Sequence, residues 1–187
     1  AVTLNNEFSG LPVIHSDDVQ GGYMAARHLI GKGCKCMVHI SGQQDLHLSA
    51  DVRMTSFMKE CERQGVACKV YSASEQMLWD MEYMPLINRI FMENPDMDGI
   101  FASSDIIAAQ CIQMAGTLGY RIPEDIKIVG YDDICLSRLL YPPLTTVHQD
   151  IQGLAKTAMD TVEELIEGKQ VPESQEDSVS FIERKTK

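Results

Sequence analysis

The chain has 187 residues, of which 44% are hydrophobic and 23% are charged, a composition typical of a globular protein. Its formal net charge is −11, and because DNA-binding surfaces depend on Lys and Arg that neutralise phosphates, this chain is not expected to hold DNA by itself. No apolar run approaches the roughly 18 residues of a membrane-spanning helix, and the first residues do not resemble a signal peptide.

The first half of the chain alternates short β-rich runs with helical segments. Glycines stop two of the predicted helices and Pro95 stops a third, because neither residue type continues a helix readily. In chain order the predicted elements are a strand over 12–16, a helix over about 21–30, a strand over 37–41, a helix over 51–64, a strand over 67–71 and a helix over about 81–93.

The second half continues the alternation. A strand over 99–102 precedes a helix whose apolar stripe recurs at helical spacing and which Gly119 caps. Strands over 126–130 and 145–147 lead into the clearest amphipathic helix, over 151–168. A polar, linker-like stretch over 167–177 separates it from a last strand over 178–183.

This order predicts an α/β fold with a parallel sheet covered by helices on both faces. Right-handed crossovers place the loops that follow the strands at one edge of the sheet, where ligands bind in open α/β folds. The fold therefore directs attention to the residues that come directly after each strand.

Polar and aromatic side chains follow several of the predicted strands. Together they offer forked donors, an aromatic face, hydroxyls, carboxylates and an amide, which suit a small polyhydroxylated ligand such as a sugar. The residues are Arg53, Trp79, Ser103, Ser104, Asp105, Asp132, Asp133, His148 and Gln149.

Several of these residues have a plainer alternative. Asp105 is equally an N-cap or first-turn acid of the helix that follows it, and Asp133 a cap of the turn after its strand, which leaves Asp132 as the better ligand candidate. Arg53 is equally consistent with a solvated charge on the surface of a helix. Trp79 is equally consistent with a residue of the hydrophobic core. Neither alternative is excluded by the sequence.

Catalysis and metal binding have little support in the residues. Asp132 and Asp133 are adjacent and should point to opposite sides, so they should not share a proton. No G-x-S-x-G, G-x-G-x-x-G or P-loop motif is present, and Cys34-Lys35-Cys36 lacks a second ligand pair. We therefore expect neither an enzyme, nor a metal, nor a cofactor, and we interpret the six cysteines as free thiols in a reducing cytosol.

The chain resembles the lac/gal repressor (LacI-type) family of transcription regulators. The resemblance rests on GYRIPEDIKIVGYDD…YPPLTTVHQD near the C-terminus, on VIHSDDVQGGYMAARHLIGKG, on DGIFASSDIIAAQCIQMAGTLG and on the final FIERKT. It implies a periplasmic-binding-protein-like fold of type I with two subdomains, an effector held between them, and a homodimer in the cytoplasm. It also implies an N-terminal helix-turn-helix headpiece outside this chain, through which operator DNA would be bound.

The resemblance further implies a division of the chain. Residues 1–32 would be the end of the N-subdomain, and residues 33–146 would form the C-subdomain. Residues 147–170 would contain a helix that returns to the N-subdomain, and residues 171–187 would contain the last strand, which leads back to the C-subdomain. The implied effector contacts are Arg53, Trp79, Ser104, Asp132 and Gln149, with Ser49 as a weaker candidate. The family often has Asn where Ser104 stands, so the effector, whether a sugar, a sugar phosphate or a purine-like molecule, stays open. A periplasmic sugar-binding protein of the same fold is the alternative.

Overall fold

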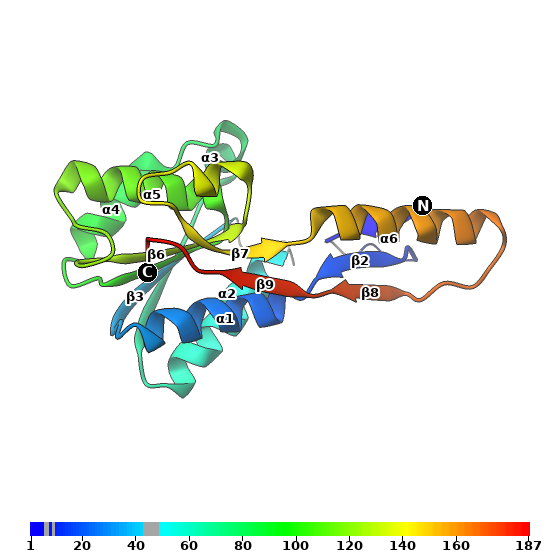
Figure 1. Ribbon diagram of the computed structural model, residues 1–187, viewed down its shortest axis with the longest axis horizontal. Helices are drawn as coiled ribbons and strands as arrows, with labels where there is room; N and C mark the ends of the chain where they lie inside the picture. The colour runs from blue at the N-terminus through cyan, green and yellow to red at the C-terminus, as the bar shows by residue number, and fades with distance from the viewer. Residues whose placement is uncertain (6–7, 9, 43–48) are drawn as a thin grey trace.

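The computed structural model describes residues 1–5, 8, 10–42 and 49–187, and shows two sheets of unequal size joined side by side (Figure 1). The larger sheet has the strand order β4-β3-β5-β6-β7-β9 and the smaller one the order β1-β2-β8. The molecule is therefore elongated, with a large and a small unit.

Five of the six strands of the large sheet are parallel, as the alternating sequence predicts. They are β3 (Cys36–Ser41), β4 (Ala67–Ser72), β5 (Gly99–Ala102), β6 (Lys127–Asp132) and β7 (Thr145–Gln149). The sixth strand, β9 (Val179–Ile182), pairs antiparallel with β7, so the prediction of a parallel sheet is wrong at this edge. An antiparallel edge strand is common on such sheets.

Helices cover both faces of the large sheet, which confirms the predicted layering. On one face α1 (Asp18–Gly31) and α2 (Ser49–Arg63) enclose a core that includes Phe57 and Phe101. On the other face α4 (Met84–Glu93) and α5 (Asp105–Leu118) enclose a larger hydrophobic core, in which aliphatic side chains predominate and which also includes Tyr83 and Phe91. Gly119 ends α5 at φ 82°, a conformation that favours glycine.

The small unit consists of β1 (Thr3–Leu4), β2 (Val13–Ser16) and β8 (Ser174–Asp177), all parallel. The amphipathic helix α6 (Ile151–Ile166) packs against it through Leu154 and Ala158, which form a small core with Ile14. Only part of the apolar stripe predicted for this helix is a packing surface, because Ile151, Met159 and Ile166 are exposed.

The described chain passes between the two units three times, from β2 to α1, from β7 to α6 and from β8 to β9. The crossings lie close together near the carboxyl end of β7 (Figure 1). We call these three adjacent connections the hinge, because connections between two units are where one unit can rotate relative to the other.

Several segments differ from the sequence-based expectation. The polar stretch expected to be a linker contains β8, which forms a strand because its backbone pairs with that of β2. A short helix, α3 (Glu75–Asp80), precedes α4, and a 3₁₀ turn, η1 (Cys135–Arg138), follows β6. The helix expected within 1–32 packs on α2 and the large unit, while β2 joins the small sheet.

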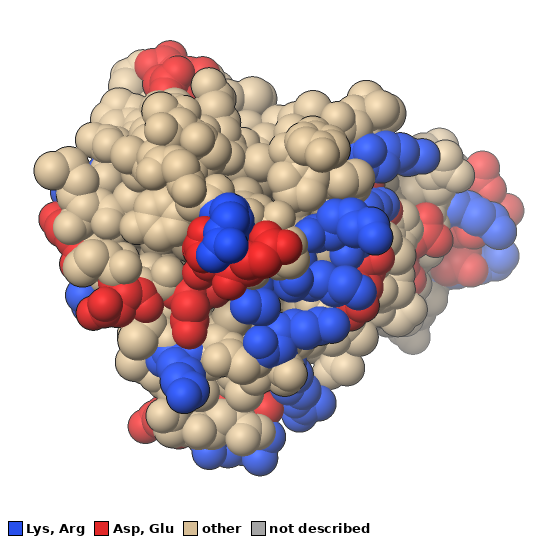
Figure 2. Space-filling model, turned by 60° about the vertical axis from the view of Figure 1, so that its left-hand side comes forward, with Lys and Arg blue, Asp and Glu red and all other residues tan. Residues whose placement is uncertain are grey.

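The surface carries both signs of charge. Figure 2 shows Lys and Arg side chains gathered over one area of the molecule, with Asp and Glu side chains among them. Some of these charges are paired, for example Lys32 with Glu183 at 3.6 Å and Arg121 with Asp125 at 2.6 Å. Among the described residues, none of the helices is long and apolar enough to cross a bilayer.

Candidate functional site

The candidate site lies at the carboxyl ends of the parallel strands of the large sheet, on the side that faces the small unit. Its central side chain is Arg53, which is 7% exposed although it carries a charge. Arg53 Nε donates to Asp18 Oδ1 at 2.6 Å, and Arg53 Nη1 donates to the Ser103 carbonyl at 3.1 Å. A buried guanidinium is stable only with such partners, so the alternative of a solvated helix charge is wrong for Arg53.

Tyr131 packs against the Arg53–Asp18 pair. The guanidinium carbon of Arg53 lies 3.7 Å from the centre of the Tyr131 ring, and Tyr131 Oη donates to Asp18 Oδ1 at 2.8 Å. Gly21 leaves the room for this, because a Cβ there would lie 2.4 Å from the Tyr131 hydroxyl. The arginine is thus fixed on one side by a carboxylate and on another by an aromatic ring.

Asp132 and Gln149 form the second part of the site. Gln149 Nε2 donates to Asp132 Oδ1 at 2.7 Å, and Ser16 Oγ donates to Gln149 Oε1 at 2.7 Å. Arg53 Nη1 lies 4.0 Å from Asp132 Oδ1. Ser16 ends β2 of the small sheet and Asp132 ends β6 of the large one, so this chain of hydrogen bonds joins the two units across the hinge.

Burial changes the pKa values of the charged groups at the site. Burial raises the pKa of Asp132 to about 6, although Arg53 and the hydrogen bond from Gln149 act in the opposite direction. Burial also opposes the charged form of Arg53, yet the nearby carboxylates Asp18 and Asp132 and the hydrogen bond to Asp18 raise its pKa overall. A carboxylate and a guanidinium therefore face the same region, one as an acceptor and one as a donor.

The two other carboxylates that follow strands, Asp105 and Asp133, are held by hydrogen bonds from other groups of the chain. The fully buried Asp105 accepts hydrogen bonds from Thr146 Oγ1 at 2.6 Å and from the Ile134 N–H at 2.9 Å. Burial raises the pKa of Asp105 to about 7. Asp133 accepts from Arg184 Nη2 at 2.6 Å. The adjacent Asp132 and Asp133 thus turn to different partners, with both backbones at positive φ.

The structure brings three of the six predicted contacts together: Arg53, Asp132 and Gln149. Ser104 is the N-cap of α5 and accepts from the Ile107 N–H at 3.4 Å, so Asp105 is a first-turn acid of that helix and not its cap. Ser49 Oγ donates to the carbonyl of Asn5 at 2.7 Å, a contact between α2 and the start of the chain.

Trp79 lies apart from this group. It stands on α3 with 78% of its surface exposed, so the alternative of a core residue is wrong. Its Nε1 donates to Glu75 Oε1 at 3.4 Å. An exposed indole is accessible to a ligand, but the described contacts do not join it to Arg53 or Asp132.

The sequence did not single out Asp18, Tyr131 and Ser16, although all three complete the site. Each has a positional signal, because Ser16 and Asp18 lie at or just after the end of the first predicted strand and Tyr131 precedes the paired aspartates. Among the described residues no group of three His, Cys, Asp or Glu side chains is arranged to hold a metal ion. The geometry offers hydrogen bonds and a fixed charge pair to a ligand.

Comparison with known proteins identifies the family to which this fold belongs. Residues 26–186 match the family described as periplasmic binding protein-like domain. The ribose operon repressor of Halalkalibacterium halodurans is 36% identical over 160 residues, which are 85% of this chain and 47% of that repressor. The chain spans about half the length of the curated repressors it matches.

Two solved structures share the fold over essentially the whole chain. A periplasmic binding protein/LacI transcriptional regulator from Alkaliphilus metalliredigens, complexed with D-xylulofuranose, is 28% identical with a TM-score of 0.84, covering 99% of this chain and 69% of that one. A dimeric Lac repressor is 25% identical with a TM-score of 0.88, covering 100% of this chain and 68% of that one. The chain belongs to the periplasmic binding protein-like domain family, and within it to the cores of LacI-type transcription regulators.

Proposed function

We propose that this chain is the effector-sensing core of a LacI-type transcription repressor whose effector is a sugar or a related small polar molecule. The observation that carries the proposal is the placement of Arg53 and Asp132, 4.0 Å apart, beside the crossings between the two units. A ligand bound there contacts the groups that join the units.

The chemistry of the pair favours a polyhydroxylated ligand. Asp132 can accept hydrogen bonds from two neighbouring hydroxyls, and Arg53 can donate from a planar fork to ring or hydroxyl oxygens. Two similar proteins support a small sugar: one is a ribose operon repressor and the other was solved with D-xylulofuranose. Pentoses are therefore the first ligands to test, with sugar phosphates and purines as comparisons.

Effector binding would act through the hydrogen-bond chain Ser16–Gln149–Asp132. In the structure, Gln149 donates to Asp132 and is itself held by Ser16 of the small sheet. A sugar hydroxyl that donates to Asp132 competes with Gln149, which changes the preferred angle between the units. Couplings of this kind are typically on the order of 1–3 kcal/mol, or about 5–150-fold in DNA affinity.

The remaining functions belong to the whole protein. Residues 1–16 and 150–178 would contribute to the N-subdomain, and 18–31 and 33–149 to the C-subdomain, with the other wall of the cleft supplied by additional chain. Operator DNA would be held in the cytoplasm by a helix-turn-helix headpiece. The similarity to a dimeric Lac repressor supports a homodimer for the whole protein.

The direct functional test is an operator-binding titration of the full-length protein, followed by fluorescence anisotropy of labelled operator DNA. A cognate sugar should change the operator affinity by about 5–150-fold, in either direction. Asp132→Asn should retain operator binding but lose the response to the sugar. Sugar binding with no effect on DNA would instead favour a sugar-binding protein of the same fold.

A further inference from the structure

The strand β4 (Ala67–Ser72) is an outer edge of the large sheet, and among the described residues no strand pairs with its outer side. Backbone groups along a strand alternate between its two sides. The Ala73 N–H donates to the Ser41 carbonyl at 3.1 Å, so the odd-numbered residues of this segment bond β3. The N–H and C=O groups of Cys68, Val70 and Ser72 therefore point outward, where they can pair with another strand.

Natural edge strands are usually protected by a proline, by a bulge or by charged side chains. The strand β4 contains no proline, and its pairing with β3 is unbroken over six residues. Its one charged side chain, Lys69, is turned toward the end of α4, where its Nζ donates to Asn94 Oδ1 at 2.8 Å. The charge thus lies over one face of the sheet, and the backbone edge of β4 is left open.

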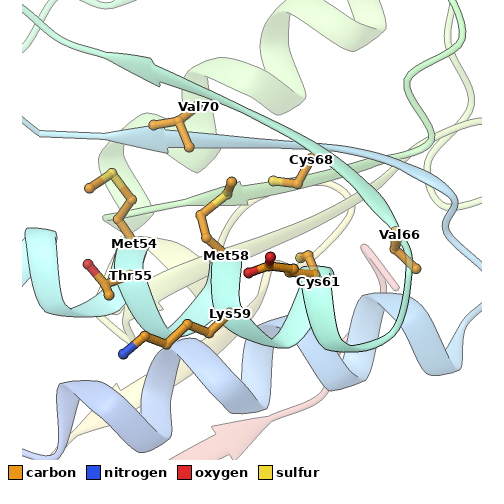
Figure 3. Close-up of a pocket in the computed structure, with 9 residues that line it drawn as sticks. Met54, Thr55, Met58, Lys59, Cys61, Val66, Cys68 and Val70 are labelled. Atoms are coloured by element: carbon orange, nitrogen blue, oxygen red, sulfur yellow. The ribbon is translucent and has the colours of Figure 1, made fainter.

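On the α2 side of the sheet, β4 borders an apolar groove of about 670 Å³ (Figure 3). Val70 lines the groove from β4, and the side chains of Met54 and Met58 extend from α2 toward the sheet. Successive side chains of a strand point to opposite faces of the sheet. A strand added to the edge of β4 would therefore place every second side chain beside this groove, and pockets of this kind give such pairing its specificity.

On the α4 side, β4 carries a polar cluster that contains both signs of charge. Tyr71 Oη donates to Glu93 Oε2 at 2.8 Å, and Asn94 Nδ2 donates to Tyr71 Oη at 2.9 Å. Lys69 stands on the same face as Tyr71, two residues earlier in the strand. A second copy of this cluster turned by 180° brings the cation of each copy toward the carboxylate of the other, so the face is complementary in charge to itself.

We propose that β4 pairs antiparallel with β4 of a second copy of this chain, about a two-fold axis at Val70. In this register Val70 exchanges hydrogen bonds with Val70 of the second copy, and Cys68 pairs with Ser72. Lys69 lies opposite Tyr71 of the second copy, beside the Glu93 that Tyr71 holds. A register centred on Lys69 would instead place like charges directly opposite each other, which is destabilising.

Two features favour a second copy over an unrelated peptide. The charges of the α4 side complement one another only in the two-fold arrangement, and the apolar grooves of the two copies meet on the α2 side of the axis. The contact uses neither Arg53 nor Asp132, so it does not rest on the proposed effector site. If the whole protein forms a homodimer through another surface, this contact joins two such dimers.

The first test is analytical ultracentrifugation of the full-length protein with Val70→Pro. Proline removes the outward N–H of residue 70 and leaves the bonds to β3 intact, which edge strands tolerate. We expect the substitution to halve the weight-average mass of the wild type. Val70→Ile is the matched control, because it keeps the N–H and the apolar side chain, and it should retain the wild-type mass. A Val70→Pro protein with the wild-type mass would overturn the proposal.

A charge exchange tests the register without changing the backbone. Lys69→Glu and Glu93→Lys should each weaken the association by about 2–30-fold, because each places like charges across the axis at two symmetric positions. The double variant should recover the wild-type association. Variants whose effects simply add, with no recovery in the double variant, would contradict this arrangement, since a purely structural role of the two residues predicts that outcome.

Cross-linking locates the axis directly. In a hydrogen-bonded antiparallel pair the two Cα atoms lie about 5.5 Å apart, which suits a disulfide. Val70→Cys should therefore link two copies through position 70 under mild oxidation, as mapped by mass spectrometry of the linked peptides. Ser180→Cys is the control, because Ser180 is exposed on β9 at the opposite edge of the same sheet. Equal cross-linking at the two positions would overturn the proposal.

Discussion

The guanidinium carbon of Arg53 lies 3.7 Å from the centre of the Tyr131 ring, while both side chains donate to the same oxygen of Asp18. This relationship joins α2, β6 and the start of α1 at the edge of the large sheet. A charged side chain that is buried this fully needs every partner it has. The arrangement therefore holds Arg53 in place before a ligand arrives, which reduces the entropy that binding costs.

Tyr131→Phe should destabilise the protein. The substitution keeps the ring against Arg53 but removes the hydroxyl that donates to the buried Asp18 carboxylate, which costs roughly 1–3 kcal/mol of unfolding free energy. Urea unfolding at pH 7 measures it. Tyr141→Phe is the control, because Tyr141 is 94% exposed and should lose almost nothing. Equal stabilities of the two variants would contradict the assigned role of the Tyr131 hydroxyl.

Effector affinity should fall in acid. The pKa of Asp132 is about 6, so its carboxylate is largely ionised at pH 7 and largely protonated at pH 5. If the ligand binds only when Asp132 is ionised, the affinity for the ligand drops by roughly tenfold from pH 7 to pH 5. Calorimetry at both pH values with the wild type and Asp132→Asn separates the effect, because the variant should show a flat profile. A wild-type profile as flat as that of the variant would exclude Asp132 as the acceptor.

Asp105 should make the protein less stable as the pH rises. Its folded-state pKa is about 7 and its ordinary value is 3.8, so the unfolded chain releases this proton first. The stability that this group contributes is complete below about pH 4 and is lost as the pH rises through 7, by roughly 2–4 kcal/mol. Asp105→Asn should flatten this part of the pH profile of urea unfolding. An unchanged slope between pH 4 and 8 would contradict the assignment.

Gly22→Ala should be strongly destabilising because α1 and α2 approach each other at this position. A Cβ on Gly22 would lie 2.4 Å from the Arg53 carbonyl and 2.0 Å from Ser56 Oγ. Separating the two helices to make room for this Cβ lowers the free energy of unfolding by roughly 1–3 kcal/mol and displaces Arg53. Gly31→Ala is the control in the same helix, where a Cβ meets nothing within 4 Å. Thermal unfolding compares them, and equal melting temperatures would argue against this close packing.

Trp79 provides a direct optical signal, because it is the only tryptophan and is 78% exposed. If it covers the apolar face of a bound sugar, its emission should shift to shorter wavelength at saturation. The sugar concentration at half the shift should match the dissociation constant from calorimetry. Binding that calorimetry detects with no change in emission would exclude Trp79 from the contacts.

Local patterns predicted much of the fold. The strand β5 and the helices α5 and α6 lie where periodicity and caps put them, because their signals are local. The strand β8 was not predictable in this way, since its polar residues Ser174–Asp177 form a strand only through pairing with β2. The antiparallel direction of β9 likewise depends on where the chain returns from the small unit.

The candidate site was predictable only in part, for a similar reason. Asp132 and Gln149 lie at the ends of strands, so their place at the sheet edge could be inferred from chain order. Asp18 is 35 residues from Arg53 and 113 residues from Tyr131 along the chain, and no local pattern encodes such contacts.

The most direct test of the proposed function is isothermal titration calorimetry of the full-length protein with D-ribose, D-xylulose, their phosphates and purines, repeated with Asp132→Asn and Arg53→Lys. We predict that one of these ligands binds at one site per chain, and that each substitution lowers its affinity by roughly 10–100-fold, the equivalent of a hydrogen bond to a charged group. Unchanged affinity in both folded variants would contradict the account, because the ligand would then be bound without the pair at the hinge.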